Sequence, residues 1–170
     1  DLNDCNLEFS GHPIAIDGQF EDWLSIETIY SDSLDMIGMS ADFKDLKITY
    51  DNEFLFIYFS FYNDEYLLQD WNSFQLYVDS DNDYTTGKFF KGIGVELSWS
   101  FGNRSGLQYL GGDVIGISHS DITLRTAPTI TSSEFEIAIA RGSTKFTTHK
   151  FIGIHGQAHR TPRLTPLKAC

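Results

Sequence analysis

FLFIYFSF, residues Phe54–Phe61, is the stretch of sequence that decides the fold. Aromatic or aliphatic side chains occupy both alternating sets of positions in it, broken only by Ser60. Alternation with a period of two is typical of a β-strand, and a short run that is apolar on both sides indicates a strand with packing on each face. The stretch therefore predicts a central strand of a sheet that is covered above and below.

Other parts of the chain show the same period. Apolar residues alternate in Phe74–Val78, in Ile93–Phe101, in Phe135–Ile139, at Ile152 and Ile154, and at Ile14 and Ile16. Turn residues such as Asp17-Gly18, Asp81-Asn82-Asp83 and Gly111-Gly112 separate these runs. We predict eight or nine strands in an all-β, antiparallel β-sandwich with jelly-roll or immunoglobulin-like layers and at most one or two short helical turns. The sandwich forms one domain over residues 1–170, with a core at about 12–156 and a C-terminal strap or tail at 157–170.

Composition limits the possible functions. The chain has 170 residues, of which 41% are hydrophobic and 15% aromatic, as expected for one packed domain. Its net charge of −12 argues against binding to the nucleic-acid phosphate backbone. No uncharged apolar run approaches the ~20 residues of a membrane helix. The first residues lack the basic and apolar regions of a signal peptide, so we expect that any such peptide has been removed.

Two cysteines, Cys5 and Cys170, lie near the two ends of the chain. Secreted domains often join their termini through a disulfide, and domain termini frequently lie close together. This placement predicts a secreted protein, extracellular or periplasmic, with a Cys5–Cys170 bridge. The alternative is that Cys170 is a reactive thiol on its own.

The sequence Asp79-Ser80-Asp81-Asn82-Asp83 carries the most specific chemical signal. Three carboxylates at alternate positions, between a strand and a turn, would repel one another unless a cation bound between them. Calcium prefers six to eight oxygen ligands from carboxylates and carbonyls. A helix-loop-helix calcium loop would need Gly where Tyr84 stands, so we predict a strand-to-turn calcium site held by Asp79, Asp81 and Asp83 with a backbone carbonyl near Thr86. The alternative is an acidic hairpin loop in solvent.

These motifs, in their order, resemble the family 9 carbohydrate-binding-module-like domains. The resemblance spans about residues 12–156 and rests on Ile16-Asp17-Gly18, Asp22-Trp23, the strand Phe54–Phe61, the run Tyr77–Asp83 with Thr86-Gly87, and Glu134–Ile139. It implies a β-sandwich with structural calcium, of the kind found in secreted modules attached to polysaccharide-degrading enzymes. The same broad fold also hosts haem-binding relatives and modules without an assigned ligand, so the fold alone does not decide function.

Sugar recognition by such modules uses aromatic rings against the apolar face of the sugar and polar groups for its hydroxyls. Trp71, in the polar run Gln69-Asp70-Trp71-Asn72, is the first candidate platform. Tyr84, beside the predicted calcium, is the second. Trp99 is the third candidate, although it shares an alternating apolar face with Leu97, which favours core packing.

The chain contains no nucleophile elbow, zinc-protease helix, phosphate loop or paired-cysteine motif, so we expect a non-catalytic module. A β-sandwich lyase using Tyr, His and Arg stays open. A protein-binding assembly module is the main alternative, because residues 137–170 contain six basic residues and no acidic one. A haem-binding relative would use Met36 or Met39 with His119.

Overall fold

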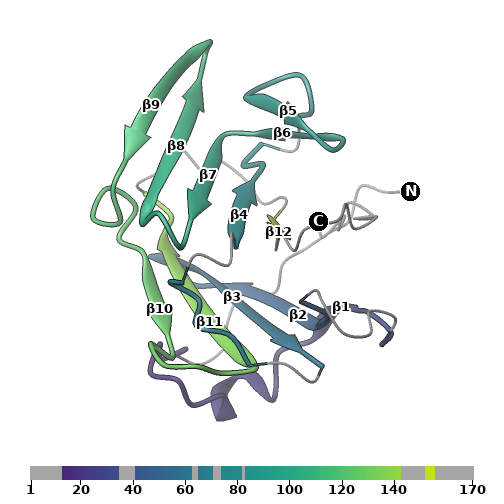
Figure 1. Cartoon of the computed structure of the whole chain (residues 1–170). Coiled ribbons are helices and arrows are strands. Elements are labelled where there is room, and N and C mark those ends of the chain that lie inside the picture. The colour runs from purple at the N-terminus through teal and green to yellow at the C-terminus, as the bar shows by residue number, and fades with distance from the viewer. Residues whose placement is uncertain are drawn as a thin grey trace.

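The computed structural model describes residues 13–34, 41–62, 65–70, 74–81 and 83–142, and the backbone of 152–155. Two five-stranded antiparallel sheets face each other, and a two-stranded hairpin stands beside the second sheet (Figure 1). Within these residues the helical structure is one 3-10 turn, η1 (Glu21–Trp23). The prediction of an all-β antiparallel sandwich with at most one or two short helical turns is confirmed.

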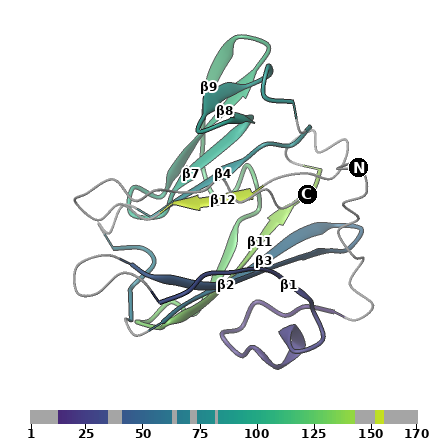
Figure 2. The same ribbon diagram turned by 90° about the vertical axis from the view of Figure 1, so that its right-hand side faces the viewer.

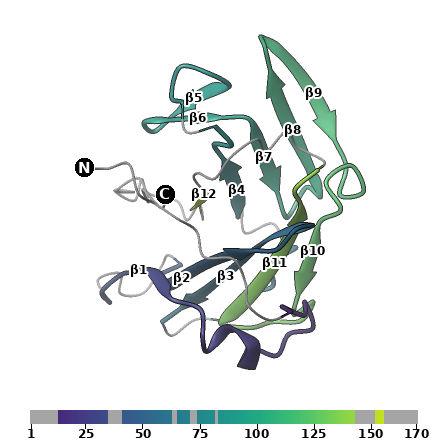
Figure 3. The same cartoon turned by 180° about the vertical axis from the view of Figure 1, so that it is seen from behind.

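The first sheet contains, in spatial order, β1 (Thr28–Ser31), β2 (Phe43–Tyr50), β3 (Phe54–Phe61), β11 (Glu134–Ala140) and β10 (Arg125–Ala127). The second sheet contains β12 (Ile152–His155), β4 (Gln75–Val78), β7 (Leu97–Ser100), β8 (Ser105–Leu110) and β9 (Asp113–Ile117). The hairpin consists of β5 (Lys88–Phe90) and β6 (Ile93–Val95). Figures 1 and 3 show η1 and this hairpin at opposite ends of the molecule.

Strand β3 occupies the centre of the first sheet, as its sequence predicts. It pairs with β2 on one side and with β11 on the other along its full length. Ile57, Phe59 and Phe61 point into the main core, whereas Phe56 and Tyr58 belong to a second cluster on the opposite face. Both faces of the strand are therefore covered.

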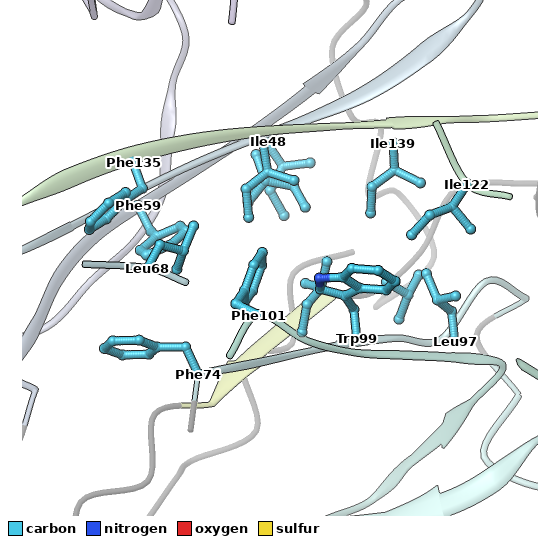
Figure 4. Packing of buried hydrophobic residues seen from close by; sticks show 14 of the residues in the cluster. Ile48, Phe59, Leu68, Phe74, Leu97, Trp99, Phe101, Ile122, Phe135 and Ile139 are labelled. Carbon is cyan, nitrogen blue, oxygen red and sulfur yellow. The ribbon is translucent and has the colours of Figure 1, made fainter. Parts of the chain in front are cut away.

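The main core lies between the two sheets (Figure 4). Phe59 of β3 stacks against Phe135 of β11 with ring centroids 5.5 Å apart. Phe61 reaches across to Phe74, just before β4, with centroids also 5.5 Å apart. Such aromatic pairs add about 0.5–1.5 kcal/mol beyond their burial. The sandwich is therefore stabilised by aromatic contacts both within one sheet and between the two.

The segment before β1 covers the outer face of the first sheet, the side away from the second sheet (Figure 2). Trp23 of η1 is buried there against Tyr58, with ring centroids 5.6 Å apart. Ile14 joins the same cluster without forming a strand, so the expected strand at Ile14 and Ile16 is wrong. The backbone of Ile14 pairs with no strand among the described residues, so Ile14 contributes through the packing of its side chain alone.

A buried carboxylate joins this covering segment to the sheet. Glu136 of β11 is fully buried, and its Oε1 accepts hydrogen bonds from the backbone N–H groups of Asp17 (2.7 Å) and Gly18 (2.6 Å). Its Oε2 accepts a hydrogen bond from Trp23 Nε1 at 2.9 Å. Three donors that would otherwise lack an acceptor in a dry site are thus satisfied by one side chain.

The single strand expected over Ile93–Phe101 is divided in the structure. Ile93 and Val95 belong to β6 and to a small cluster around the hairpin, whereas Leu97 and Trp99 belong to β7 and the main core. This division and several short edge strands give twelve strands in the described part of the chain, where eight or nine were expected. The break falls at Glu96, a residue whose role is described below.

Several predictions fall outside the described residues. These are the bridge between Cys5 and Cys170, the tail at 157–170 and the proposed platform Trp71. Among the residues that the structure does describe, there is no helix with the length and apolar character needed to cross a membrane.

Replacing Glu136 with Ala is expected to lower the free energy of unfolding by about 3 kcal/mol or more, because each orphaned buried donor costs about 1–3 kcal/mol. Glu134→Ala on the same strand is the matched control, since Glu134 accepts only the Tyr58 hydroxyl, at 2.8 Å. Urea denaturation followed by fluorescence gives both values. Equal losses in the two variants would contradict the role assigned to Glu136.

Candidate metal centre

The candidate site lies where the chain leaves β4 and returns to β7. Asp79 follows the last residue of β4, and Glu96 precedes the first residue of β7. The N–H of Glu96 donates to the carbonyl of Val78 at 3.0 Å, which extends the pairing of these two strands. Because side chains alternate along a strand and Leu97 points into the core, Glu96 points to the outer side of the second sheet.

Three carboxylates converge at this place. One oxygen from each of Asp79, Asp81 and Glu96 lies within 4.8 Å of the others. Asp79 is only 3% exposed and Glu96 only 8%, whereas Asp81 is exposed. Two of the three charges are thus held away from water and beside a third.

Thr86 contacts the same cluster through its hydroxyl group. Its Oγ1 lies 2.9 Å from Asp81 Oδ2, 3.0 Å from Glu96 Oε1 and 2.9 Å from the carbonyl oxygen of Asp83. A hydroxyl carries one proton and can donate to one of these acceptors at a time. Acceptor oxygens around Thr86 therefore outnumber the available protons, which makes this an oxygen-rich site.

Two glycines allow the loop to approach the strands closely. Gly87 has a φ of +60°, and a Cβ at this residue would lie 2.5 Å from Glu96 Oε1. A Cβ on Gly94 would lie 2.2 Å from the carbonyl oxygen of Asp83 and 2.4 Å from that of Thr86. Larger residues at either position would push the loop away from the strands, so glycine at 87 and 94 is a steric requirement of the site.

The electrostatics follow from burial and from like charge. Burial raises the pKa of Glu96, and the nearby charges of Asp81 and Asp79 raise it further. Hydrogen bonds from the backbone N–H of Ser80 (2.7 Å) and from the Thr86 hydroxyl act in the opposite direction. The ionised cluster is thus unfavourable by itself, and a bound cation would offset the repulsion.

The residues present fit a metal ion that prefers oxygen. Two oxygens bound to one calcium ion at about 2.3–2.6 Å can be at most about 5 Å apart. The carboxylate oxygens of the cluster, all within 4.8 Å of one another, satisfy this limit. The cluster contains no His or Cys ligand, which favours calcium or magnesium over zinc or copper. The structure thus brings together an acidic cluster that could hold a metal ion.

The acidic cluster shares Asp79 and Asp81 with the predicted ligand set. Asp83 was expected as the third carboxylate, but it is not in the cluster, because its Oδ1 accepts from the N–H (2.9 Å) and the hydroxyl (2.6 Å) of Thr85. These bonds also lower the pKa of Asp83. A backbone carbonyl near Thr86 was expected as a further ligand; the carbonyl of Thr86 itself lies against Gly94, and its hydroxyl faces the cluster.

Glu96, the third carboxylate of the cluster, could not be recognised from the sequence, because it lies seventeen positions after Asp79. Its place in an alternating pattern indicates only an ordinary polar residue of a strand. A signal was present nonetheless. Gly87 and Gly94 flank the hairpin that brings the chain back, and Gly94 stands inside the expected strand. Glycine within a strand often marks a bend or a close backbone approach.

The predicted aromatic platform is also partly revised. Trp99 is 2% exposed in the main core, so the core-packing alternative holds and its ring offers no face to a ligand. Tyr84 is 65% exposed on the loop that carries the cluster. Phe89 of β5, which the sequence analysis did not single out, is 66% exposed. Two aromatic rings therefore face solvent on the segment between Asp83 and Glu96.

The residues suggested for haem ligation remain to be placed. Met36 and Met39, the suggested haem ligands, lie outside the described residues, and His119 is exposed in the connection between β9 and β10.

Comparison with known proteins does not assign the chain to a family. No family model matches it, and neither a curated protein nor a solved structure matches it either. Its function must therefore be argued from the site.

Replacing Glu96 with Gln is expected to raise the melting temperature in chelator at pH 7, because one of three clustered charges is removed. The amide can still accept from Ser80 and donate to the Thr86 oxygen. With a divalent cation added, the same variant is expected to lose cation-dependent stabilisation. Glu53→Gln, in the exposed turn between β2 and β3, is the control for a simple loss of charge.

The sign of the pH dependence follows from the raised pKa of Glu96. Its stabilising, protonated form is fully present below the ordinary value near 4.5 and is lost as pH rises through the raised pKa. The difference between wild type and Glu96→Gln in chelator should therefore be present at pH 7 and close towards pH 4. A difference that stays constant over this range would contradict the assignment.

Proposed function

We propose that this protein is a secreted, non-catalytic, calcium-stabilised β-sandwich module that binds carbohydrate, as its resemblance to family 9 carbohydrate-binding modules implies. One observation carries the proposal. The loop that brings Asp79, Asp81 and Glu96 together also presents two solvent-facing rings, Tyr84 and Phe89. A cation that fixes this loop would fix the position of the rings, which are the groups that contact the apolar face of a sugar.

Calcium is supported by the donor set. Asp79, Asp81 and Glu96 would supply carboxylate oxygens, the Thr86 hydroxyl a neutral one, and water the rest of the six to eight positions that calcium takes. Magnesium demands near-ideal octahedral geometry at shorter distances and usually keeps several waters. A set of two buried carboxylates and one exposed carboxylate on a loop suits the larger and more tolerant ion.

Calcium is expected to raise the melting temperature of the wild type, and at one hundred times its dissociation constant it adds about 2.7 kcal/mol to the free energy of unfolding. Asp81→Asn should remove this shift. Asp83→Asn should retain it, because the Asp83 carboxylate bonds to Thr85 outside the cluster. Thermal melts in calcium, magnesium and chelator test this, and equal behaviour of the two variants would overturn the ligand set.

Carbohydrate binding is supported by the exposure of rings that the core does not use. Tyr84 and Phe89 belong to none of the hydrophobic clusters of the described residues. Large exposed apolar groups in one short segment favour a surface that binds a partner. Carbohydrate suits them because it combines apolar ring faces with hydroxyls, and the exposed Thr85 directly follows Tyr84 in the loop.

Affinity electrophoresis through gels containing soluble neutral or acidic polysaccharides tests this function. Retardation by at least one polysaccharide is expected, and Tyr84→Ala or Phe89→Ala should weaken it about five-fold, corresponding to about 1 kcal/mol. Trp71→Ala tests the platform predicted from sequence alone. Leu24→Ala, at an exposed apolar residue near η1, is the control. No retardation by any polysaccharide would refute the proposed function.

A protein-binding assembly module is the second candidate, and the edge strand β9 favours it. β9 pairs only with β8 among the described strands, and Val114 and Ile115 are 60% and 49% exposed. An open edge with exposed apolar side chains can accept a strand from another chain. Capture of one specific cell-surface protein, lost on Val114→Lys, would favour this candidate over carbohydrate.

A further inference from the structure

The outer face of the second sheet, beside the hairpin, carries polar and aromatic side chains that take no part in the metal site. Strand alternation places Gln75 and Tyr77 of β4, Ser98 and Ser100 of β7, and Leu107 and Tyr109 of β8 on the face opposite the core. Leu107 is 40% exposed, and none of these six side chains is fully buried. This face offers rings, hydroxyls and an amide.

The hairpin adds two cations to this face. Lys88 Nζ lies 5.7 Å from the centroid of the Tyr109 ring, and Lys91 Nζ lies 5.6 Å from that of Phe90. Phe90 in turn stacks on Tyr77, with ring centroids 4.4 Å apart and an angle of 25° between the rings. Contacts between cations and rings, together with this stack, hold both ammonium groups beside the outer face.

The local charge is opposite to that of the whole chain. The chain has twice as many acidic as basic residues, yet the segment between Asp83 and Glu96 contains Lys88 and Lys91 and no acidic residue. Carboxylates on this side of the sheet belong to the cluster of Asp79, Asp81 and Glu96 at the end of β4, whereas the side chains that β4, β7 and β8 place on the outer face include none. Within the described residues, neither lysine forms an ion pair; the one recorded there joins Lys44 to Asp45.

We infer that this face binds an acidic polysaccharide, whose carboxylate or sulfate groups contact Lys88 and Lys91 while its sugar rings lie against Leu107 and the parts of Tyr77 and Tyr109 that the hairpin leaves exposed. The inference rests on the proposed carbohydrate binding and names the class of glycan. A neutral glycan would leave both ammonium groups without a partner, whereas an anionic one supplies the charge that this acidic protein lacks here. Ser98 and Ser100 can bond to sugar hydroxyls.

The hairpin position connects this face to the metal centre. Gly94 of β6 lies against the carbonyls of Asp83 and Thr86, and Phe90 of β5 lies on Tyr77. Loosening of the loop by removal of the cation would shift the strand that carries Lys88 and Phe90. Glycan affinity is therefore expected to fall in chelator, although no glycan atom needs to touch the cation.

The test compares polygalacturonate with its fully methyl-esterified form, in which each carboxylate is a neutral methyl ester on the same sugar backbone, by affinity electrophoresis in calcium. The wild type should be retarded by the acid and at least ten-fold less by the ester, and added salt should weaken retardation by the acid. Attraction by net charge cannot produce this result, because a protein of net charge −12 is repelled by a polyanion, and the lysine variant below separates binding at this face from bridging of carboxylates by calcium. Alginate and chondroitin sulfate are run in parallel to separate uronate from sulfate recognition.

Lys88→Gln keeps most of the side-chain stem and removes the charge, and it should weaken retardation by the acid about ten-fold. Lys44→Gln on β2 is the matched control and should have no effect. Retardation by neutral polysaccharides only, or by acid and ester equally with Lys88→Gln unchanged, would overturn the acidic-glycan inference and leave the proposed function standing. Absence of retardation by every neutral and acidic polysaccharide would overturn both.

Discussion

The architecture depends on one constraint, which is that β3 is apolar on both faces. Burying one large apolar side chain contributes about 1.5–3 kcal/mol, so leaving either face of this strand in water would forfeit a large part of the folding free energy. The second sheet covers the face that carries Phe59, and the segment around Trp23 covers the face that carries Phe56. The first sheet is therefore the middle layer of the molecule, and both of its coverings are required.

Each sheet also carries one buried glutamate on its outer side, and each glutamate collects hydrogen bonds from a segment that crosses over it. Glu136 binds three N–H donors of the N-terminal segment, and Glu96 binds Ser80 and Thr86 of the loop after β4. Burial raises the pKa of both carboxyl groups. The difference lies in the neighbours: Glu136 faces three donors, whereas Glu96 faces two further carboxylates. The charge of Glu136 is stabilised by hydrogen bonds from the protein alone, whereas a bound cation would offset the repulsion among Glu96, Asp79 and Asp81.

Sequence reasoning predicted what depends on local pattern. The two-faced strand Phe54–Phe61, the all-β class and the position of Asp79 and Asp81 at a strand end all follow from residues close together in the chain. Glu96 could not be predicted in this way, because its contact with Asp79 depends on how β4 and β7 pair. Asp83 looks equivalent to Asp81 in the sequence, and only the turn geometry shows that Thr85 takes up its carboxylate.

The same limit applies to the proposed glycan-binding surface. The sequence analysis considered Trp99 as a ligand platform, but this residue packs in the core. Tyr77 and Tyr109 become neighbours of Phe90 and Lys88 only when the hairpin folds over the outer face. Gly87 and Gly94 decide how closely that hairpin approaches. The acidic cluster and the basic, aromatic face are thus two ends of one folded segment. Whatever fixes the segment at its acidic end also affects the spacing of rings and cations at the other, so the proposed cation site and the proposed glycan surface would be physically coupled.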